Sequence, residues 1–170
     1  MKRLLFSLLA LMSFAMNVRA ANVSLTPDGN GGYYVNLVKQ QTSTLTLDGT
    51  VTSFKVYDDG GASGDMSTGT HRDYLVINAP DGYKLKVDGY MYTQQSTQVT
   101  LYDGSSSSAT VLAGPLSPSY RYCSINATST GNSMMLYFYD FYASSGYEGL
   151  NLTLPRSAIR LISSRSAIRL

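Results

Sequence analysis

The chain has 170 residues, with 13 Lys and Arg against 11 Asp and Glu, a formal net charge of +2. Seven basic residues precede position 21 or follow position 154, so residues 21–154 keep six basic against eleven acidic residues, a net charge of −5. This balance excludes the basic footprint of a nucleic-acid-binding domain. Cys123 is the only cysteine, which excludes an intrachain disulfide.

Residues 1–20 read as a secretory signal peptide. Lys2 and Arg3 precede an apolar run over 4–16, and a small residue, Ala20, closes a suitable cleavage site. We therefore expect the mature chain to begin near Ala21. The apolar run is shorter than the ~20 residues of a spanning helix, although an uncleaved anchor stays an alternative. No later segment approaches that length, so we expect no transmembrane segment after cleavage.

Residues 21–154 consist of short strand-like runs separated by turn signals. Asp-Gly and Asn-Gly pairs, which tolerate the positive φ of tight turns, separate runs rich in tyrosine and β-branched residues. No window here has the apolar period of a helix. The pattern predicts an all-β single domain, a sandwich or a barrel, with strands at 33–38, 43–48, 51–57, 73–79, 83–93, 97–102, 109–113, 133–142 and 148–154.

The long Gly/Ser-rich connections at 58–72 and 103–108 are expected on the surface, where loops carry recognition. The first contains the densest group of acids, Asp58, Asp59 and Asp65, spaced by glycines and a serine. Calcium takes 6–8 oxygen ligands, and glycines let backbone carbonyls turn inward beside carboxylates. The group therefore suggests a calcium site, although an ordinary solvated Asp/Gly turn explains it as well.

Tyrosine offers the most plausible recognition chemistry, because its ring stacks on a sugar or anchors an interface at low entropic cost. Tyr120, Arg121 and Tyr122 stand together in a Pro/Ser-rich connection, and Tyr90 and Tyr92 lie near a strand end. We take Tyr120, Arg121 and Tyr122 as candidate ligand-binding residues. Tyrosines at alternate positions also fit one face of a sheet, and that alternative stays open.

The sequence offers few residues that are typical of catalytic sites. His71 is the sole histidine and is expected to be an exposed loop residue, and Glu148 is the sole glutamate. The chain lacks a Gly-x-Ser-x-Gly elbow and a zinc-binding His-Glu-x-x-His motif. We therefore expect a protein that is not an enzyme. Cys123 is expected to be buried and inert, with pairing to another chain or reactivity as alternatives.

The tail over 155–170 contains Arg-Ser-Ala-Ile-Arg-Leu twice and begins with Pro155, a natural stop for the last strand. We expect this Arg-rich segment to be disordered. It reads either as a basic amphipathic helix that touches a partner or as repetitive sequence without a selected function.

Three segments in order resemble the CUB domain. They are residues 74–87, YLVINAPDGYKLKV; residues 99–106, VTLYDGSS; and residues 133–140, SMMLYFYD, followed by Gly149 and Leu150. The stretch 54–65 also resembles an opening common in bacterial CUB-like proteins. The resemblance covers about residues 50–154 and implies a jelly-roll antiparallel β-sandwich that is exported and recognises protein or carbohydrate.

The chain departs from the CUB pattern at two places. CUB domains usually carry two disulfides, and this chain can form none. Many also bind calcium, and here the resemblance implies only part of that site. Asp140 matches the late-loop aspartate and Asp103 lies in the turn after the signature strand, whereas Ser96 and Thr97 stand where a carboxylate is expected.

The sequence as a whole predicts a secreted CUB-like module that binds extracellular protein or carbohydrate without catalysis. The alternative is a structural or matrix-type surface protein, or the N-terminal fragment of a longer secreted protein. A calcium ion is the one cofactor that the residues suggest, at Asp58, Asp59, Asp65, Asp103 and Asp140.

Overall fold

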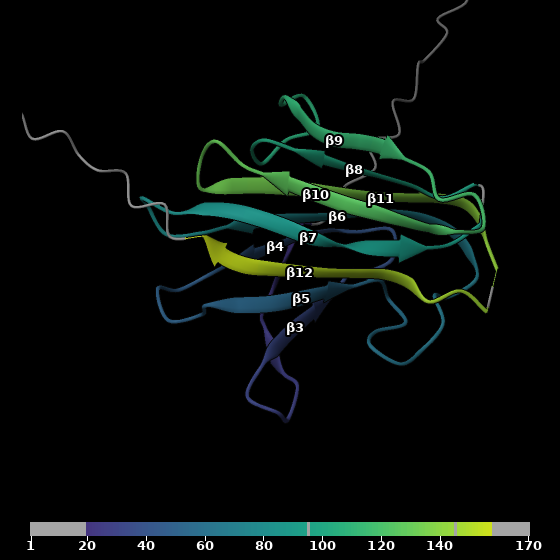
Figure 1. Ribbon diagram of the computed structural model, residues 1–170, viewed down its shortest axis with the longest axis horizontal. Helices are drawn as coiled ribbons and strands as arrows, with labels where there is room; N and C mark the ends of the chain where they lie inside the picture. The colour runs from purple at the N-terminus through teal and green to yellow at the C-terminus, as the bar shows by residue number, and fades with distance from the viewer. Residues whose placement is uncertain (1–19, 95, 145, 158–170) are drawn as a thin grey trace, which may run out of the picture.

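The computed structural model describes residues 20–94, 96–144 and 146–157, and this part of the chain folds as two stacked β-sheets (Figure 1). Each sheet has six strands, and the described residues form no helix. Accordingly, none of these residues belongs to a helix long and apolar enough to cross a membrane. The expected all-β sandwich is thereby confirmed.

The first sheet has the strand order β1-β4-β6-β11-β8-β9, and the second has the order β10-β7-β12-β5-β3-β2. Neighbouring strands are antiparallel except for the parallel pairs β1/β4, β4/β6 and β3/β5, so both sheets are mixed rather than wholly antiparallel. The strand bounds are β1 Ala20–Val23, β2 Thr26–Pro27, β3 Tyr33–Asn36, β4 Thr42–Thr46, β5 Ser53–Tyr57, β6 Gly69–Asn78, β7 Lys84–Tyr92, β8 Gln98–Tyr102, β9 Val111–Leu116, β10 Tyr122–Thr128, β11 Ser133–Ala143 and β12 Gly149–Ser157.

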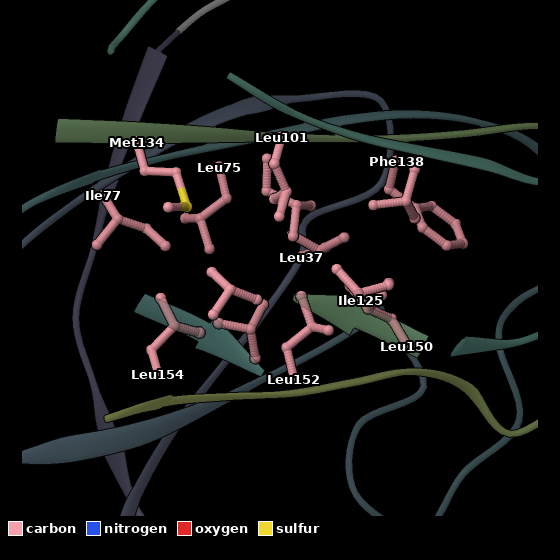
Figure 2. Packing of buried hydrophobic residues seen from close by; sticks show 14 of the residues in the cluster. Leu37, Leu75, Ile77, Leu101, Ile125, Met134, Phe138, Leu150, Leu152 and Leu154 are labelled. Atoms are coloured by element: carbon pink, nitrogen blue, oxygen red, sulfur yellow. The ribbon is translucent and has the colours of Figure 1, made fainter. Parts of the chain in front are cut away.

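Alternation along the strands builds the core between the sheets (Figure 2). Successive strand residues point to opposite faces, so every second side chain of β12 and β11 turns inward. Leu150, Leu152 and Leu154 of β12 are all buried and face Met134 and Phe138 of β11 across the interior. Burying a side chain of this kind stabilises the fold by about 1.5–3 kcal/mol, so the domain needs no disulfide.

All nine predicted strands are present, with ends that differ by a few residues. β6 begins four residues earlier than predicted, and β9 lies slightly later. β1, β2 and β10 were not predicted. β10 was missed because Ile125 is its only large inward residue and is flanked by the small Cys123 and Ala127, which make a weak apolar pattern.

The expected stop at Pro155 is wrong, because β12 continues to Ser157. Pro155 lacks an N–H, and the β12/β7 pairing is interrupted at 154–155 but resumes at Arg156 in the same register. Residues 1–19 of the predicted signal peptide and residues 158–170 of the Arg-rich tail lie outside the described residues, whereas Ala20 begins β1.

Strand direction sorts the connections to two ends of the sandwich. β5 and β7 run toward one end, drawn on the right in Figure 1, and β10 and β12 start there. The described parts of the connections at this end are 37–41, 58–68, 93–94 with 96–97, 117–121, and 144 with 146–148. We call it the acidic end, because four of the five predicted calcium ligands lie in it.

Candidate functional site: a tyrosine-lined face of one sheet

The structure separates the five aspartates that the sequence suggested as calcium ligands. Asp103 follows β8 at the end opposite to the acidic end, where it accepts hydrogen bonds from the backbone N–H and hydroxyl of Thr130 at 2.8 and 2.6 Å. These two bonds lower the pKa of Asp103. Asp103 therefore holds the β8–β9 and β10–β11 turns together and lies away from the other four.

Asp58, Asp59 and Asp65 are occupied by donors from neighbouring segments. The fully buried Asp58 accepts the backbone N–H groups of Gly60 and Leu150 at 2.8 and 2.7 Å. Burial raises the pKa of Asp58 more than these bonds lower it. Asp59 accepts the N–H and hydroxyl of Ser67, and Asp65 accepts the N–H of Gly146 at 2.8 Å.

Asp140 is fully buried at the end of β11 inside a shell of donors. It accepts hydrogen bonds from the hydroxyls of Ser96 and Thr97, from the side-chain amide of Gln94 and from the N–H of Tyr142. The described residues contain no group of three His, Cys, Asp or Glu side chains placed to hold a metal ion. Calcium binding stays a prediction, which a calcium-dependent rise in the unfolding temperature would support.

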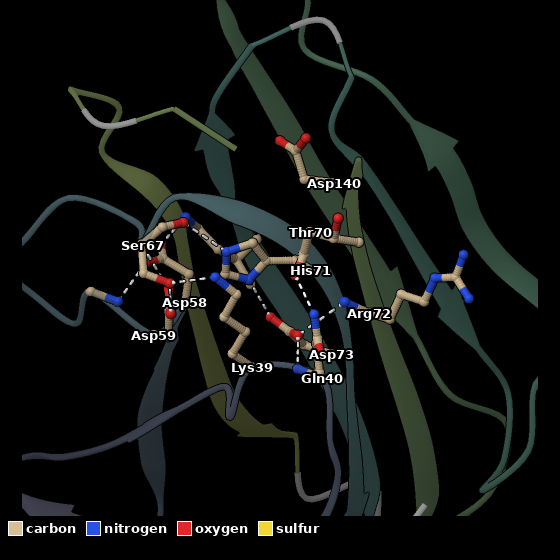
Figure 3. A network of polar contacts seen from close by, with 12 residues as sticks. Lys39, Gln40, Asp58, Asp59, Ser67, Thr70, His71, Arg72, Asp73 and Asp140 are labelled. Atoms are coloured by element: carbon tan, nitrogen blue, oxygen red, sulfur yellow. Dashed lines mark hydrogen bonds and ion pairs between the residues drawn. The ribbon is translucent and has the colours of Figure 1, made fainter. Parts of the chain in front are cut away.

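The expectation that His71 is an exposed loop residue is wrong. β6 begins at Gly69, and its alternation turns His71 and Asp73 inward, where both are fully buried (Figure 3). His71 Nδ1 lies 2.8 Å from Asp73 Oδ2, and Nε2 lies 2.8 Å from the carbonyl oxygen of Ser67. Because both ring nitrogens face acceptors, the imidazolium form satisfies both.

The surroundings of His71 shift its pKa in opposing directions. Burial lowers the pKa, but the hydrogen bonds to Asp73 and to the Ser67 carbonyl, with the charges of Asp73 and Asp59, raise it by more. The ring also meets Phe138 edge-on, with centroids 5.8 Å apart. His71 thus ties the 58–68 connection to the core of the first sheet.

Two exposed and three partly buried tyrosines gather at the outer face of the second sheet, near the acidic end. Five rings form a connected group, which we call the tyrosine cluster: Tyr90, Tyr92, Tyr120, Tyr122 and Tyr147. The Tyr92 and Tyr122 rings are stacked with centroids 4.8 Å apart, and Tyr90 meets Tyr122 edge-on at 5.1 Å. Register explains the grouping, since Tyr122 of β10 stands opposite Tyr92 of β7.

The carboxylate of Glu148 binds the hydroxyl groups of two tyrosines of the cluster. It accepts the hydroxyl hydrogen of Tyr122 at 2.8 Å and that of Tyr90 at 3.4 Å, and the amide of Asn151 donates to the Tyr90 hydroxyl at 3.3 Å. The bond to Glu148 raises the pKa of Tyr122. The rings of Tyr90 and Tyr122 are therefore held in place before any ligand arrives, which reduces the entropy lost on binding.

The structure brings Tyr120 and Tyr122 into this cluster and leaves Arg121 exposed between them. Both tyrosines are 58% exposed. Tyr120 and its neighbour Ser119 adopt left-handed backbone conformations, with φ of 62° and 51°, which are uncommon for residues other than glycine. Tyr147 and Glu148 were not predicted to belong to a site, because only the pairing of β12 with β7 brings them next to Tyr92.

A groove continues from the cluster across the sheet. Its first part is lined by Tyr90, Glu148, Asn151 and Tyr57, and its second by Tyr57, Asn36, Tyr34, Tyr33, Lys55 and Asp28. Both parts share Tyr57 and residues 61–63, so they adjoin. The 60–65 turn forms one wall, and only glycine fits at position 60, because a Cβ there would lie 2.3 Å from the carbonyl oxygen of Asp65.

Cys123 lies on the inward side of β10 and is partly buried against the core, so it is less buried than expected. Its Sγ atom approaches the carbonyl oxygen of Ser124 at 3.9 Å. The inward direction places the thiol on the face of β10 opposite to Tyr122.

No family model matches the chain, and no curated protein matches it in sequence. Among solved structures, the full extracellular region of zebrafish Gpr126/Adgrg6 is similar, with a TM-score of 0.44 and 16% identity. The match covers 68% of this chain and 14% of that one. A likeness this distant identifies neither a family nor a function.

Proposed function

We propose that this chain is an exported, non-catalytic CUB-like module that recognises an extracellular protein or carbohydrate through the tyrosine cluster. The single observation that carries the proposal is the pre-arranged group of five aromatic rings on one open sheet face. Tyrosine is enriched in binding surfaces because its ring is large and rigid and its hydroxyl still forms hydrogen bonds.

The backbone conformation of two residues beside the cluster also supports this surface as the binding site. Non-glycine residues in the left-handed region cost about 1–3 kcal/mol each and cluster at ligand-binding positions. Ser119 and Tyr120 both adopt this region, and the Tyr120 N–H bonds the Thr93 carbonyl at 3.1 Å. The chain thus holds an exposed ring at the cluster's edge at an energetic cost, which a purely structural turn would not need.

The test is binding of the purified chain to arrays of glycans and of extracellular proteins. The double variant Tyr120→Ser, Tyr122→Ser should lose most of the signal for any ligand that the unmodified chain binds, because it removes two rings that are 58% exposed. Val111→Ser is the control, since Val111 is 48% exposed on the edge strand β9 of the other sheet and should leave binding unchanged.

Two outcomes would contradict the proposal. Equal binding by the double variant would place the ligand elsewhere. Self-association of the chain into polymers without binding to either array would favour the structural, matrix-type alternative.

A further inference from the structure

We infer that the groove beside the tyrosine cluster binds a linear, uncharged glycan that lies across strands β7, β12, β5 and β3. The inference rests on the proposed function and names its ligand class. It starts from one row of side chains in the sheet: Tyr90, Asn151, Tyr57 and Asn36 stand directly opposite one another on neighbouring strands.

This row alternates aromatic rings with amides at a constant spacing. Neighbouring strands lie about 4.8 Å apart, so the four positions span about 14 Å. Each sugar of an extended glycan advances by a similar distance, which places successive sugars over successive strands. A ring stacks on the apolar C–H face of a sugar, and an amide both donates to and accepts from hydroxyl groups. Within the row, Tyr90 therefore offers a ring to a sugar and Asn151 offers hydrogen bonds to its hydroxyl groups, while the nearly buried Tyr57 forms the surface beneath.

The shape of the surface favours a glycan over a folded protein as the ligand. The row lies in two adjoining hollows, and the 60–65 turn rises along one side of both. Tyr57 is only 7% exposed and forms the floor that the hollows share. Stable protein interfaces bury roughly 800 Å² on each partner, whereas a narrow chain enters a groove that is walled in this way.

The charges along the groove favour neutral glycans over anionic ones. The charged side chains that line the two parts are Asp28, Asp65 and Glu148 with one base, Lys55, a net charge of −2. Sulfated or uronic-acid glycans would be repelled, and no lining arginine offers the bidentate contacts that such anions favour. Neutral hydroxyl groups meet no such penalty.

The far end of the row retains hydrogen-bonding capacity. The Oδ1 atom of Asn36 is buried and has no partner among the described residues, and it lies beneath Gly61. A buried acceptor left unpaired costs about 1–3 kcal/mol. Gly61, which carries no side chain, is the cover between this atom and the groove, so a sugar hydroxyl that displaced it would satisfy the acceptor.

The experiment is calorimetric titration of the full chain with neutral linear oligosaccharides of glucose, mannose and N-acetylglucosamine, of two to six sugars, and with heparin oligosaccharides. The chain is produced in a host that does not glycosylate, because residues 151–153 form an Asn-x-Thr triplet. We expect a neutral series whose affinity rises with length to about four sugars, and no measurable binding of heparin.

Variants tie the binding to the row. Tyr90→Ala and Asn151→Ala should each weaken binding about tenfold, equal to about 1.4 kcal/mol, whereas Tyr90→Phe should keep most of the affinity because it keeps the ring. Tyr139→Ala is the matched control, since Tyr139 is a half-buried tyrosine on the outer face of the other sheet. Thermal unfolding confirms that each variant is folded.

The outcomes separate this inference from the proposed function. Binding of a neutral series that is unaffected by Tyr90→Ala and Asn151→Ala, or tighter binding of heparin, would overturn the groove assignment. Another outcome is that the chain binds no oligosaccharide but binds a protein from the arrays in a way that requires Tyr120 and Tyr122. That result would refute the glycan as ligand and leave the proposed function standing.

Discussion

Raising the pH should destabilise the domain through His71. The ring is fully buried, and its two nitrogens each lie 2.8 Å from an acceptor oxygen. The imidazolium donates to both acceptors, whereas neutral imidazole can donate to only one and turns a lone pair toward the other. Deprotonation therefore removes one buried hydrogen bond of a charged group, which is worth about 1.5–3 kcal/mol.

The sign follows from the direction of the pKa shift. The folded-state pKa of His71 is raised above the unfolded value of 6.5. The stabilisation is therefore fully present below pH 6.5 and is lost as the pH rises through the folded-state pKa. Over that interval the free energy of unfolding should fall by at most about 1.4 kcal/mol per pH unit.

Urea unfolding at a series of values from about pH 5 to about pH 9 measures this dependence. His71→Gln is the matched control, because it cannot titrate and should give a lower but flatter curve over the same range. Asp73→Asn removes the partner's charge and should move the fall to lower pH. A free energy of unfolding that stays constant or rises above pH 6.5 in the unmodified chain would refute the reasoning.

Two further predictions concern the buried carboxylates. Gly149→Ala should destabilise the fold by roughly 3–5 kcal/mol, because φ is 72° and the new Cβ would lie 1.8 Å from Asp58 Oδ2. Gly146 has a similar φ but no neighbour within 4 Å, so Gly146→Ala should cost only the backbone strain. If urea unfolding gave equal losses of stability for the two variants, the clash with Asp58 would not be the cause. Thr97→Val removes a hydroxyl that donates to the buried Asp140 and should cost about 1.5–3 kcal/mol, whereas a change within about 0.5 kcal/mol would show that the other donors suffice.

The strands of this fold were largely predictable from the sequence because alternation is a local signal. Leu150, Leu152 and Leu154 mark one face of β12 without reference to any other strand. β10 carries the same alternation with one large apolar residue, Ile125, between two small ones, so its pairing with β7 is the clearer evidence of a strand. The start of β6 before Asp73 was missed because its one fully buried residue, His71, is polar and finds its partner in Asp73.

The candidate site was predictable only in part. Tyr120 and Tyr122 were identified because tyrosine suits recognition and both flank Arg121 in a Pro/Ser-rich stretch, and both belong to the cluster. Asn151 could not be identified, because its place beside Tyr90 depends on register between strands that are distant in sequence. The aspartates were grouped by closeness in sequence or by resemblance to the CUB domain, whereas strand direction sends Asp103 to the opposite end.

The central claim is that ligand binds to the tyrosine-bearing outer face of the second sheet. Nuclear magnetic resonance of the chain with ¹³C-labelled tyrosine rings tests it most directly, with the tightest soluble ligand from the arrays added stepwise. The account predicts shifts for Tyr90 and Tyr122 and unchanged resonances for Tyr74 and Tyr137, which stack on each other on the opposite sheet. Shifts at Tyr74 and Tyr137 with none at Tyr90 and Tyr122 would contradict it.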